Sequence, residues 1–220
     1  MIRLFCGFDE REEAGYHVFA GSVIRRASQP VAFMPLTHMG MPTGTNTFTF
    51  SRFLVPWLCG RKGRAIFADA SDMIMLQDVA TLDSTFDPKF AVQVVKHKAY
   101  ETRHPIKYLG TPMEAPNKNY ERKNWVSLMV VNCEHHAWDA ITPAYVARAA
   151  PLDLLQLQFL EDSHIGELPP RWNCLVDEGQ ACDEAAILHW TTGIPAFKRY
   201  RSVPRAEMWF EERDKMMGVT

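Results

Sequence analysis

A short, wholly apolar run that ends in acidic residues is the feature that most constrains the fold. Residues 65–68 read Ala-Ile-Phe-Ala, and Asp69 and Asp72 follow closely. A strand that is apolar at every position is typical of a parallel sheet buried on both faces. Ligands of open α/β sheets bind beyond the carboxyl ends of the strands, so the two aspartates stand where a binding site is expected.

Further strands and helices alternate around this run. Apolar residues at spacings of three and four predict helices within residues 16–27 and 50–58, and Pro56 should kink the second. This alternation indicates an α/β fold. With 220 residues, 47% of them hydrophobic, and no internal repeat, we expect a single domain over residues 1–220. The predicted strands are residues 2–5, 31–36, 65–68, 90–95, 127–131 and 185–188.

Composition argues against several classes of function and partner. A net charge of −2 gives no overall attraction to nucleic acid or anionic lipid. The five cysteines are scattered without a C-x-x-C pair, so we expect neither a disulfide framework nor a thiolate zinc site, and a reducing, cytoplasmic setting. The first apolar run is too short for a signal peptide, and prolines interrupt the uncharged stretch 29–51, so no transmembrane segment is expected.

Polar side chains follow four of the predicted strands. If these strands are parallel neighbours, the side chains converge on one crevice. Two carboxylates and one imidazole suit Mn²⁺ or Mg²⁺ with open positions better than a structural zinc ion. Such an ion would bridge the phosphates of a nucleotide sugar, and a cation such as Lys198 could contact the same phosphates. The residues concerned are Asp9, Asp69, Asp72, Asn132 and His189.

Motifs along nearly the whole chain resemble those of glycosyltransferase family 8. Residues 63–78, with a hydrophobic strand, paired aspartates and a further Asp78, resemble the D-x-D segment of that family. Other matching pieces follow in the same order at residues 5–9, 51–53, 127–132, 168–173 and 189–198. The resemblance implies a GT-A-like, mostly parallel nucleotide-binding sheet flanked by helices. It also implies metal-dependent transfer of a sugar from a nucleotide-diphosphate sugar to an acceptor, with a UDP-sugar as the first candidate for the donor.

The resemblance also implies roles for individual residues. Asp69 and Asp72 would coordinate the metal or the donor ribose, with His189 as the third protein ligand. Asp72 and Asn132 are the catalytic candidates. The donor would be held by Gly7, Phe8 and Asp9 at the base, Arg52, and Gly193 with Lys198 at the diphosphate. The aspartates are spaced i, i+3 rather than i, i+2, so a turn or bulge must absorb one extra residue.

Several of these residues also have an ordinary structural interpretation. Asp9 with Glu12 fits an N-terminal capping box, which is compatible with contact to a base. Arg52 fits a salt bridge as well as a donor contact, and Lys198 fits a solvated basic turn. The histidine pair at residues 135–136 fits a solvated helix face better than a metallohydrolase site.

The long segment 96–123 has no clear period and is rich in Lys, Arg, Tyr and Pro. Segments of this length in a compact domain are usually functional or disordered, and we interpret this one as an acceptor site or lid. The acceptor stays open among a saccharide, a lipid-linked molecule and a protein. We expect four basic residues of the segment to serve transfer to the acceptor rather than donor binding: Arg103, Lys107, Arg122 and Lys123.

Two other functions fit part of the pattern. A sugar-phosphate nucleotidyltransferase shares the α/β plan, but its first strand usually leads into a Gly-rich loop. Here a single glycine, Gly7, is followed by acidic residues. A non-catalytic nucleotide- or sugar-binding module is the other alternative, and the altered aspartate spacing favours it.

Overall fold

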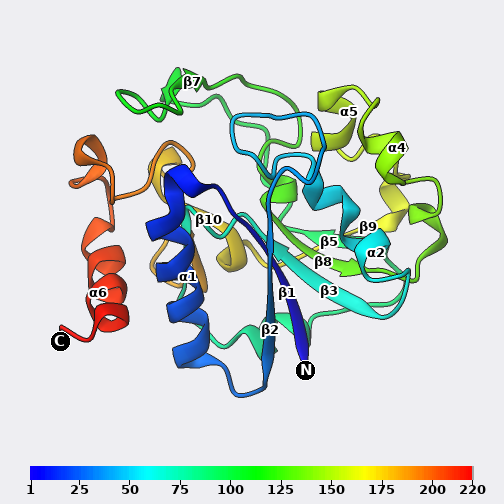
Figure 1. The fold of residues 1–220 in the computed structure, drawn as a ribbon, viewed down its shortest axis with the longest axis horizontal. Coiled ribbons are helices and arrows are strands. Elements are labelled where there is room, and N and C mark those ends of the chain that lie inside the picture. The colour runs from blue at the N-terminus through cyan, green and yellow to red at the C-terminus, as the bar shows by residue number, and fades with distance from the viewer. Residues whose placement is uncertain (220) are drawn as a thin grey trace.

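The computed structural model describes residues 1–219 and is built around a six-stranded mixed sheet (Figure 1). The strand order is β2-β1-β3-β8-β5-β9. Strand β1 pairs in parallel with β2 and β3, and β5 pairs in parallel with β9, whereas β8 runs antiparallel to β3 and β5. The predicted α/β class with a mostly parallel sheet is confirmed. The strands are β1 (Ile2–Gly7), β2 (Val31–Leu36), β3 (Arg64–Ala68), β5 (Val92–Val94), β8 (Leu128–Asn132) and β9 (Ile165–Glu167).

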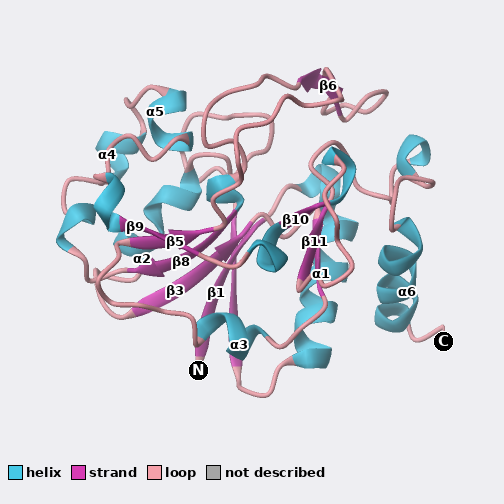
Figure 2. Ribbon diagram, turned by 180° about the vertical axis from the view of Figure 1, so that it is seen from behind, coloured by secondary structure: helices cyan, strands magenta, loops and turns pink. Residues whose placement is uncertain are grey.

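Both faces of the sheet are covered by helices. Residues of α1 and α3 share one hydrophobic cluster with the sheet, and residues of α2, α4 and α5 share the other. The C-terminal helix α6 packs on the outer side of α1 (Figures 1 and 2). The α-helices are α1 (Glu13–Arg26), α2 (Val55–Leu58), α3 (Val79–Asp83), α4 (Pro143–Val146), α5 (Pro151–Leu155) and α6 (Ala206–Met217). Short 3-10 helices are η1 (Glu10–Glu12), η2 (Ser51–Leu54), η3 (Trp125–Ser127), η4 (His136–Trp138), η5 (Asp162–His164), η6 (Pro170–Asn173), η7 (Val176–Glu178) and η8 (Lys198–Tyr200).

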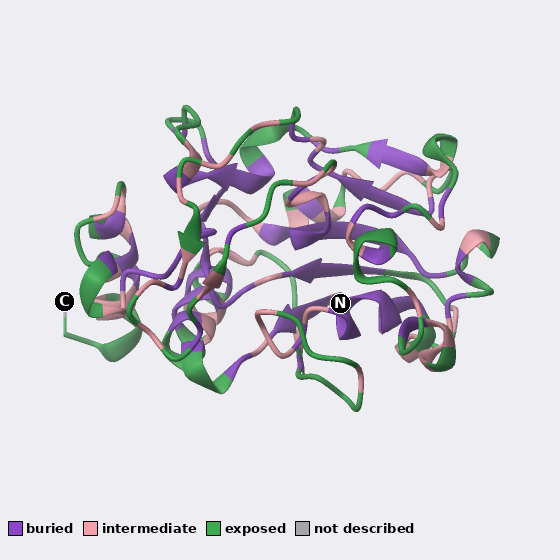
Figure 3. Ribbon diagram, turned by 90° about the horizontal axis from the view of Figure 1, so that it is seen from above, coloured by how far each residue is buried: buried purple, intermediate pink, exposed green. Residues whose placement is uncertain are grey.

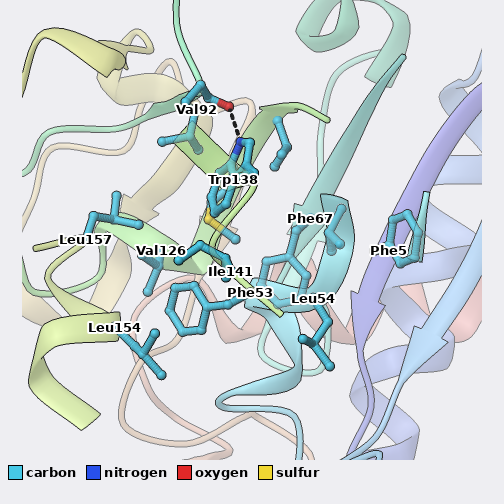
Figure 4. Packing of buried hydrophobic residues seen from close by; sticks show 14 of the residues in the cluster. Phe5, Phe53, Leu54, Phe67, Val92, Val126, Trp138, Ile141, Leu154 and Leu157 are labelled. Carbon is cyan, nitrogen blue, oxygen red and sulfur yellow. Dashed lines mark hydrogen bonds between the residues drawn. The ribbon is translucent and has the colours of Figure 1, made fainter. Parts of the chain in front are cut away.

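Strand β3 is buried on both faces, as its composition predicts. Ala65 and Phe67 belong to the cluster beneath α2, α4 and α5, and Ile66 and Ala68 belong to the cluster beneath α1. Figure 4 shows Phe67 in the first cluster, where Trp138 also packs, and Figure 3 shows buried strands through the centre of the molecule. This rigid central strand fixes the position of whatever follows Ala68.

The predicted kinked helix over residues 50–58 is two separate helices. Helix η2 ends at Leu54, and α2 begins at Val55 with Pro56 in its first turn, where the missing N–H breaks no helical hydrogen bond. Phe53 and Leu54 are buried as expected, but Trp57 is 48% exposed, so its predicted burial is wrong.

Two smaller sheets complete the fold. Strands β10 (Cys174–Leu175), β11 (Ile187–His189) and β4 (Met73–Met75) form a three-stranded sheet in which β11 runs antiparallel to β4. The strand predicted at residues 185–188 therefore belongs to this second sheet and not to the main one. Strands β6 (Ile106–Lys107) and β7 (Ala115–Pro116) form a hairpin within the long segment 96–123 (Figure 2).

One disulfide joins Cys174 and Cys182, whose Cα atoms are 5.8 Å apart. The expectation that no cysteines pair is therefore wrong for these two, whereas Cys6, Cys59 and Cys133 are free. The thiol count no longer supports a reducing compartment, so the cytoplasmic setting stays a prediction. Among the described residues, no helix combines the length and apolarity needed to cross a bilayer.

Candidate active site

Asp69 and Asp72 lie on a tight turn that connects β3 to β4. Ala70 adopts a φ of 51°, in the left-handed region that side chains with a Cβ rarely enter, and its carbonyl accepts the N–H of Met73 at 3.1 Å. The N–H of Asp69 donates to the carbonyl of Ser127 at 2.8 Å, which ties the turn to the start of β8. This turn absorbs the extra residue of the Asp-Ala-Ser-Asp spacing.

His189 reaches the same place through the second sheet. Antiparallel pairing of β11 with β4 sets His189 opposite Met73, and the N–H of Trp190 donates to the carbonyl of Asp72 at 2.9 Å. The Nε2 atom of His189 then lies 3.3 Å from Oδ1 of Asp72. One potential ligand atom from each of Asp69, Asp72 and His189 lies within 4.8 Å of the others. The predicted convergence of these three side chains is confirmed.

Asn173 determines which nitrogen of His189 faces the carboxylates. The Nδ2 atom of Asn173 donates to Oγ of Ser127 at 2.8 Å and to the carbonyl of Asn124 at 3.2 Å, so its Oδ1 must accept from Nδ1 of His189 at 2.9 Å. In neutral His189 the Nε2 lone pair therefore faces Oδ1 of Asp72, and only a proton or a cation between them satisfies both atoms.

The buried carboxylates are suited to hold a cation. Burial raises the pKa of Asp69 to about 6, although the positive charge of Arg52 opposes the shift. Burial alone would lower the pKa of His189, but the charge and hydrogen bond of Asp72 raise it above its ordinary value. Oδ1 of Asp69 and Oδ1 of Asp72 are both buried, and their only close polar neighbours among the described residues are charged or titratable groups, Nη1 of Arg52 at 2.7 Å and Nε2 of His189 at 3.3 Å. Asp69, Asp72 and His189 thus fit a divalent ion with carboxylate and imidazole ligands.

Arg52 contacts Asp69 rather than a residue of its own helix. Its Nη1 lies 2.7 Å from Oδ1 of Asp69, and it donates to the carbonyl of Val126 at 3.0 Å. The guanidinium group also lies over the rings of Phe48 and Phe67, at 5.4 and 5.0 Å from their centroids. Arg52 therefore forms a salt bridge, but with Asp69 after β3 and not on its own helix as expected, and contact with a donor stays a prediction.

These side chains open into a cleft of about 450 Å³. The long segment 96–123, with its hairpin β6–β7, forms one wall, and residues of α5 and the 43–52 region form others. Lining side chains include Asn46, Arg52, Asp69, Asp72, Lys107, Tyr108, Asn117, Tyr120, Lys123, Ser127, Leu152, Leu155, His189 and Thr191.

Asp9 is fully occupied by local partners. Its carboxylate accepts from Nε and Nη2 of Arg11 at 2.8 and 2.6 Å, and from the N–H of Thr47 at 3.0 Å. Burial would raise the pKa of Asp9, but these hydrogen bonds outweigh it and hold the pKa below its ordinary value. The side chain of Asp9 caps η1, as expected. The side chain of Glu12 does not accept a hydrogen bond from the N–H of Asp9, so the predicted reciprocal capping box is not formed.

Glu12 instead contacts Asn46, a residue that lines the cleft. Its Oε2 accepts from Nδ2 of Asn46 at 2.8 Å, while its Oε1 is buried without a partner among the described residues. Burial, with the nearby charges of Asp72 and Asp9, raises the pKa of Glu12 well above its ordinary value. The sequence pattern had indicated Glu12 only as part of a capping box with Asp9, not as a buried group near the cleft.

The remaining candidates for donor binding, Gly7, Phe8 and Gly193, are not among the described residues that line the cleft. Gly7 is packed beneath the ring of Phe48, and Phe8 packs edge-on against Tyr16. Gly193 has a φ of 153°, and a Cβ there would lie 2.7 Å from the ring of Tyr200. The roles of Gly7, Phe8 and Gly193 in donor binding stay predictions.

Lys198 and Asn132 are not brought to the cluster. Lys198 is exposed in η8, which favours its interpretation as part of a solvated basic turn. Because β8 runs antiparallel to β3, Asn132 pairs with Arg64 at the opposite end of the sheet, and its side chain donates to Pro88. The prediction that Asn132 is the catalytic carboxamide is wrong for this reason. Ser127, at the other end of β8, lies beside the site.

Asn173 and Asp177 are positioning residues that sequence reasoning missed. Asp177 accepts from the backbone N–H and hydroxyl groups of Thr191 and Thr192 at 2.6–3.3 Å, which fixes the chain after His189. Asn173 is the last residue of the Leu-Pro-Pro-Arg-Trp-Asn motif at residues 168–173, and this motif is the sequence feature that could have indicated its role.

If His189 is a metal ligand, replacing Asn173 with Leu is expected to weaken Mn²⁺ binding about 10- to 100-fold, because partners that orient a histidine ligand typically contribute this much to metal affinity. Titration calorimetry with Mn²⁺ in the presence of UDP measures the effect. Gln29→Leu, which removes an exposed amide that is not among the described residues lining the cleft, is the control. Equal affinities for both variants would show that Asn173 does not orient His189.

Comparison with solved structures identifies the class of fold. The chain aligns with galactosyltransferase LgtC in complex with donor and acceptor sugar analogues at a TM-score of 0.64 and 13% identity, covering 97% of this chain and 96% of LgtC. It also aligns with the apo bifunctional glycosyltransferase WbbM (TM-score 0.68, 14% identity, 96% of this chain) and with apo GlyE of Streptococcus pneumoniae TIGR4 (0.65, 13%, 99%). The chain spans 49% of the WbbM chain and 62% of the GlyE chain. The fold is that of the GT-A glycosyltransferases, which confirms the fold implied by the motif resemblance.

Sequence comparison gives the family. No protein-family model matches the chain. The Arabidopsis thaliana protein named Protein CDI is 31% identical over 230 residues, which cover 97% of this chain and 86% of the plant protein. The chain therefore belongs to the family of Protein CDI.

Proposed function

We propose that this chain is a metal-dependent glycosyltransferase that acts as a single domain and transfers a sugar from a nucleotide-diphosphate sugar, a UDP-sugar foremost. The observation that carries the proposal is the cluster of Asp69, Asp72 and His189. Its potential ligand atoms lie within 4.8 Å of one another, in the cleft of a GT-A fold. The acceptor, a saccharide, a lipid-linked molecule or a protein, would enter the same cleft.

The residues around the cluster have distinct tasks in this proposal. Asp69, Asp72 and His189 would hold Mn²⁺ or Mg²⁺, which when bound supplies electrostatic stabilisation of the departing diphosphate. Asn173 would keep Nε2 of His189 directed at the ion. Arg52 would stabilise the ionised form of Asp69, since its positive charge opposes the effect of burial on the pKa of that carboxyl group. The segment 96–123 would cover the donor and reduce the access of water.

Mn²⁺ and UDP together are expected to stabilise the protein far more than the sum of their separate effects. Each completes the coordination of the other in the proposed site. A ligand pair at about 100 times its dissociation constant adds about 2.7 kcal/mol. For a domain of this size, that raises Tm by about 5–10 °C in a thermal-shift assay. Uridine, which lacks the diphosphate, is the control and should show no synergy with Mn²⁺. Purely additive shifts across UDP, GDP and ADP would contradict the proposed donor site.

A metal-free binding module is the second candidate, and the ion pair between Arg52 and Asp69 favours it. At 2.7 Å, this pair occupies a carboxylate oxygen that a metal would need. Such a module would bind UDP equally well in EDTA and would not hydrolyse a UDP-sugar in Mn²⁺. Hydrolysis that depends on Mn²⁺ would exclude it.

A further inference from the structure

Four basic side chains line the cleft, and three of them are already engaged or exposed. Arg52 pairs with Asp69 and donates to backbone carbonyls. Nζ of Lys123 donates to Oδ1 of Asn117 at 2.8 Å and lies over an aromatic ring. Lys118 is exposed. The fourth, Lys107, makes no hydrogen bond or ion pair with any other described residue.

Lys107 lines the same cleft as the carboxylates of Asp69 and Asp72 and the imidazole of His189. Burial lowers the pKa of Lys107, and the negative charges of Asp72, Asp69 and Glu12 act against this shift. Because the ammonium group shares the cleft with the carboxylates but forms no ion pair with them, it is available to bind an anion there.

The backbone beside Lys107 is held in place by the chain that follows His189. The N–H of Tyr108 donates to the carbonyl of Thr192 at 2.6 Å, and the N–H of Leu109 donates to the hydroxyl of Tyr200 at 2.7 Å. The ring of Tyr200 occupies the space where a Cβ on Gly193 would lie. The segment 192–200, which follows β11, thus supports the β6–β7 hairpin that carries Lys107 and links this hairpin to the strand that carries His189.

The cleft carries more basic than acidic side chains. Asp69 and Asp72 are opposed by Arg52, Lys107, Lys118 and Lys123, and a bound divalent ion would add further positive charge. A diphosphate diester, which carries two negative charges, suits such a site. Because the ammonium group of Lys107 has no polar partner among the described residues, a phosphate oxygen bound there would supply one.

We propose that Lys107 binds the phosphate oxygens of the donor diphosphate, the role that the family resemblance implied for Lys198. The proposal rests on the proposed glycosyltransferase function. It also assigns Lys107 to the donor rather than to the acceptor, in contrast to the expectation from its position in the long segment. The β6–β7 hairpin is then part of the donor site.

Binding of inorganic pyrophosphate and of UDP, each with Mn²⁺, tests this proposal by titration calorimetry. Pyrophosphate probes the diphosphate site whatever nucleobase the protein prefers. Two neutral variants, Lys107→Met and Lys107→Gln, are expected to weaken both ligands about tenfold to a hundredfold, the usual loss when a charge-assisted hydrogen bond is removed. Lys107→Arg should bind within a few-fold of the wild type, because it keeps the charge.

Lys62→Met, which removes an exposed lysine that is not among the described residues lining the cleft, and Lys198→Met are the controls and should bind within about twofold of the wild type. Wild-type affinity in both neutral variants would overturn the assignment of Lys107 and leave the proposed function intact. If only Lys198→Met lost affinity, the assignment of Lys107 would be overturned, and Lys198 would be the lysine that binds the diphosphate. If the wild type binds neither probe with Mn²⁺, the proposed function itself fails, and the role of Lys107 fails with it.

Discussion

Replacing Asp72 with Asn is expected to abolish metal-dependent sugar transfer while leaving the ligand-free protein as stable as the wild type. Loss of a metal ligand removes several kcal/mol of stabilisation from the charge on the departing diphosphate, which corresponds to a fall in kcat of about a thousandfold or more. Asn has the same shape, and it relieves the repulsion between two buried carboxylates, so folding should not suffer. Initial rates of UDP-sugar turnover in Mn²⁺ and Tm without ligand measure the two effects.

Asp139→Asn is the matched control for this substitution. Asp139 is exposed and is not among the described residues that line the cleft, so both rate and Tm should be unchanged. A fully active Asp72→Asn enzyme would refute the assignment of Asp72 as a metal ligand. An unfolded Asp72→Asn protein would instead mean that the side chain serves the turn after β3.

The apolar run 65–68 was the most reliable guide to the fold. Four consecutive apolar residues are typical of a strand buried on both faces, and the polar residues that follow such a strand leave the sheet at its edge. The positions of Asp69 and Asp72 could therefore be predicted. The i, i+3 spacing also required a turn, which the positive φ of Ala70 provides.

Strand direction could not be predicted from the same pattern. A short apolar run looks the same whether its strand is parallel or antiparallel to its neighbour. The strand predicted at residues 127–131 is found as β8, Leu128–Asn132, in the centre of the sheet. Because β8 runs antiparallel to β3, Asn132 lies at the end of the sheet away from the aspartates, and Ser127, just before β8, lies at the end beside them. The position of His189 beside the two aspartates was predicted correctly although its strand belongs to a different sheet, because the motif around it, not the sheet topology, identified it.

The long segment 96–123 shows the limit of pattern analysis. Without a hydrophobic period, nothing in the sequence separates Lys107, which lies in the cleft, from Arg122, which pairs with Asp162. Its only regular structure is a hairpin of two-residue strands. The contacts that hold the segment come from residues distant in sequence, such as Thr192 and Tyr200, and only the structure reveals them.

The closest approach between α1 and the aspartate turn depends on Gly15. A Cβ added to Gly15 would overlap the carbonyl oxygen of Ser71 and lie 2.9 Å from its carbonyl carbon. Both are backbone atoms, so no side-chain rotation relieves the clash. Ser71 lies between Asp69 and Asp72, and its hydroxyl donates to the carbonyl of Gly7 at 3.2 Å. Any added volume at Gly15 must therefore move either the helix or the turn that carries the carboxylates.

Gly15→Ala is accordingly expected to destabilise the protein by about 3 kcal/mol, at the upper end of typical overpacking costs, and to lower Tm by about 6–12 °C. It should also reduce the synergistic Mn²⁺ and UDP shift, since the Asp69–Asp72 turn is displaced. Gly21→Ala in the same helix is the control, because its Cβ would meet no backbone atom, only side-chain atoms of Arg25 at 3.0 Å and of Met216 at 3.4 and 3.5 Å. There the gain in helix propensity, about 1 kcal/mol, should raise Tm by about 2–4 °C. If Gly15→Ala were as stable as Gly21→Ala, the contact between α1 and Ser71 would not constrain the site.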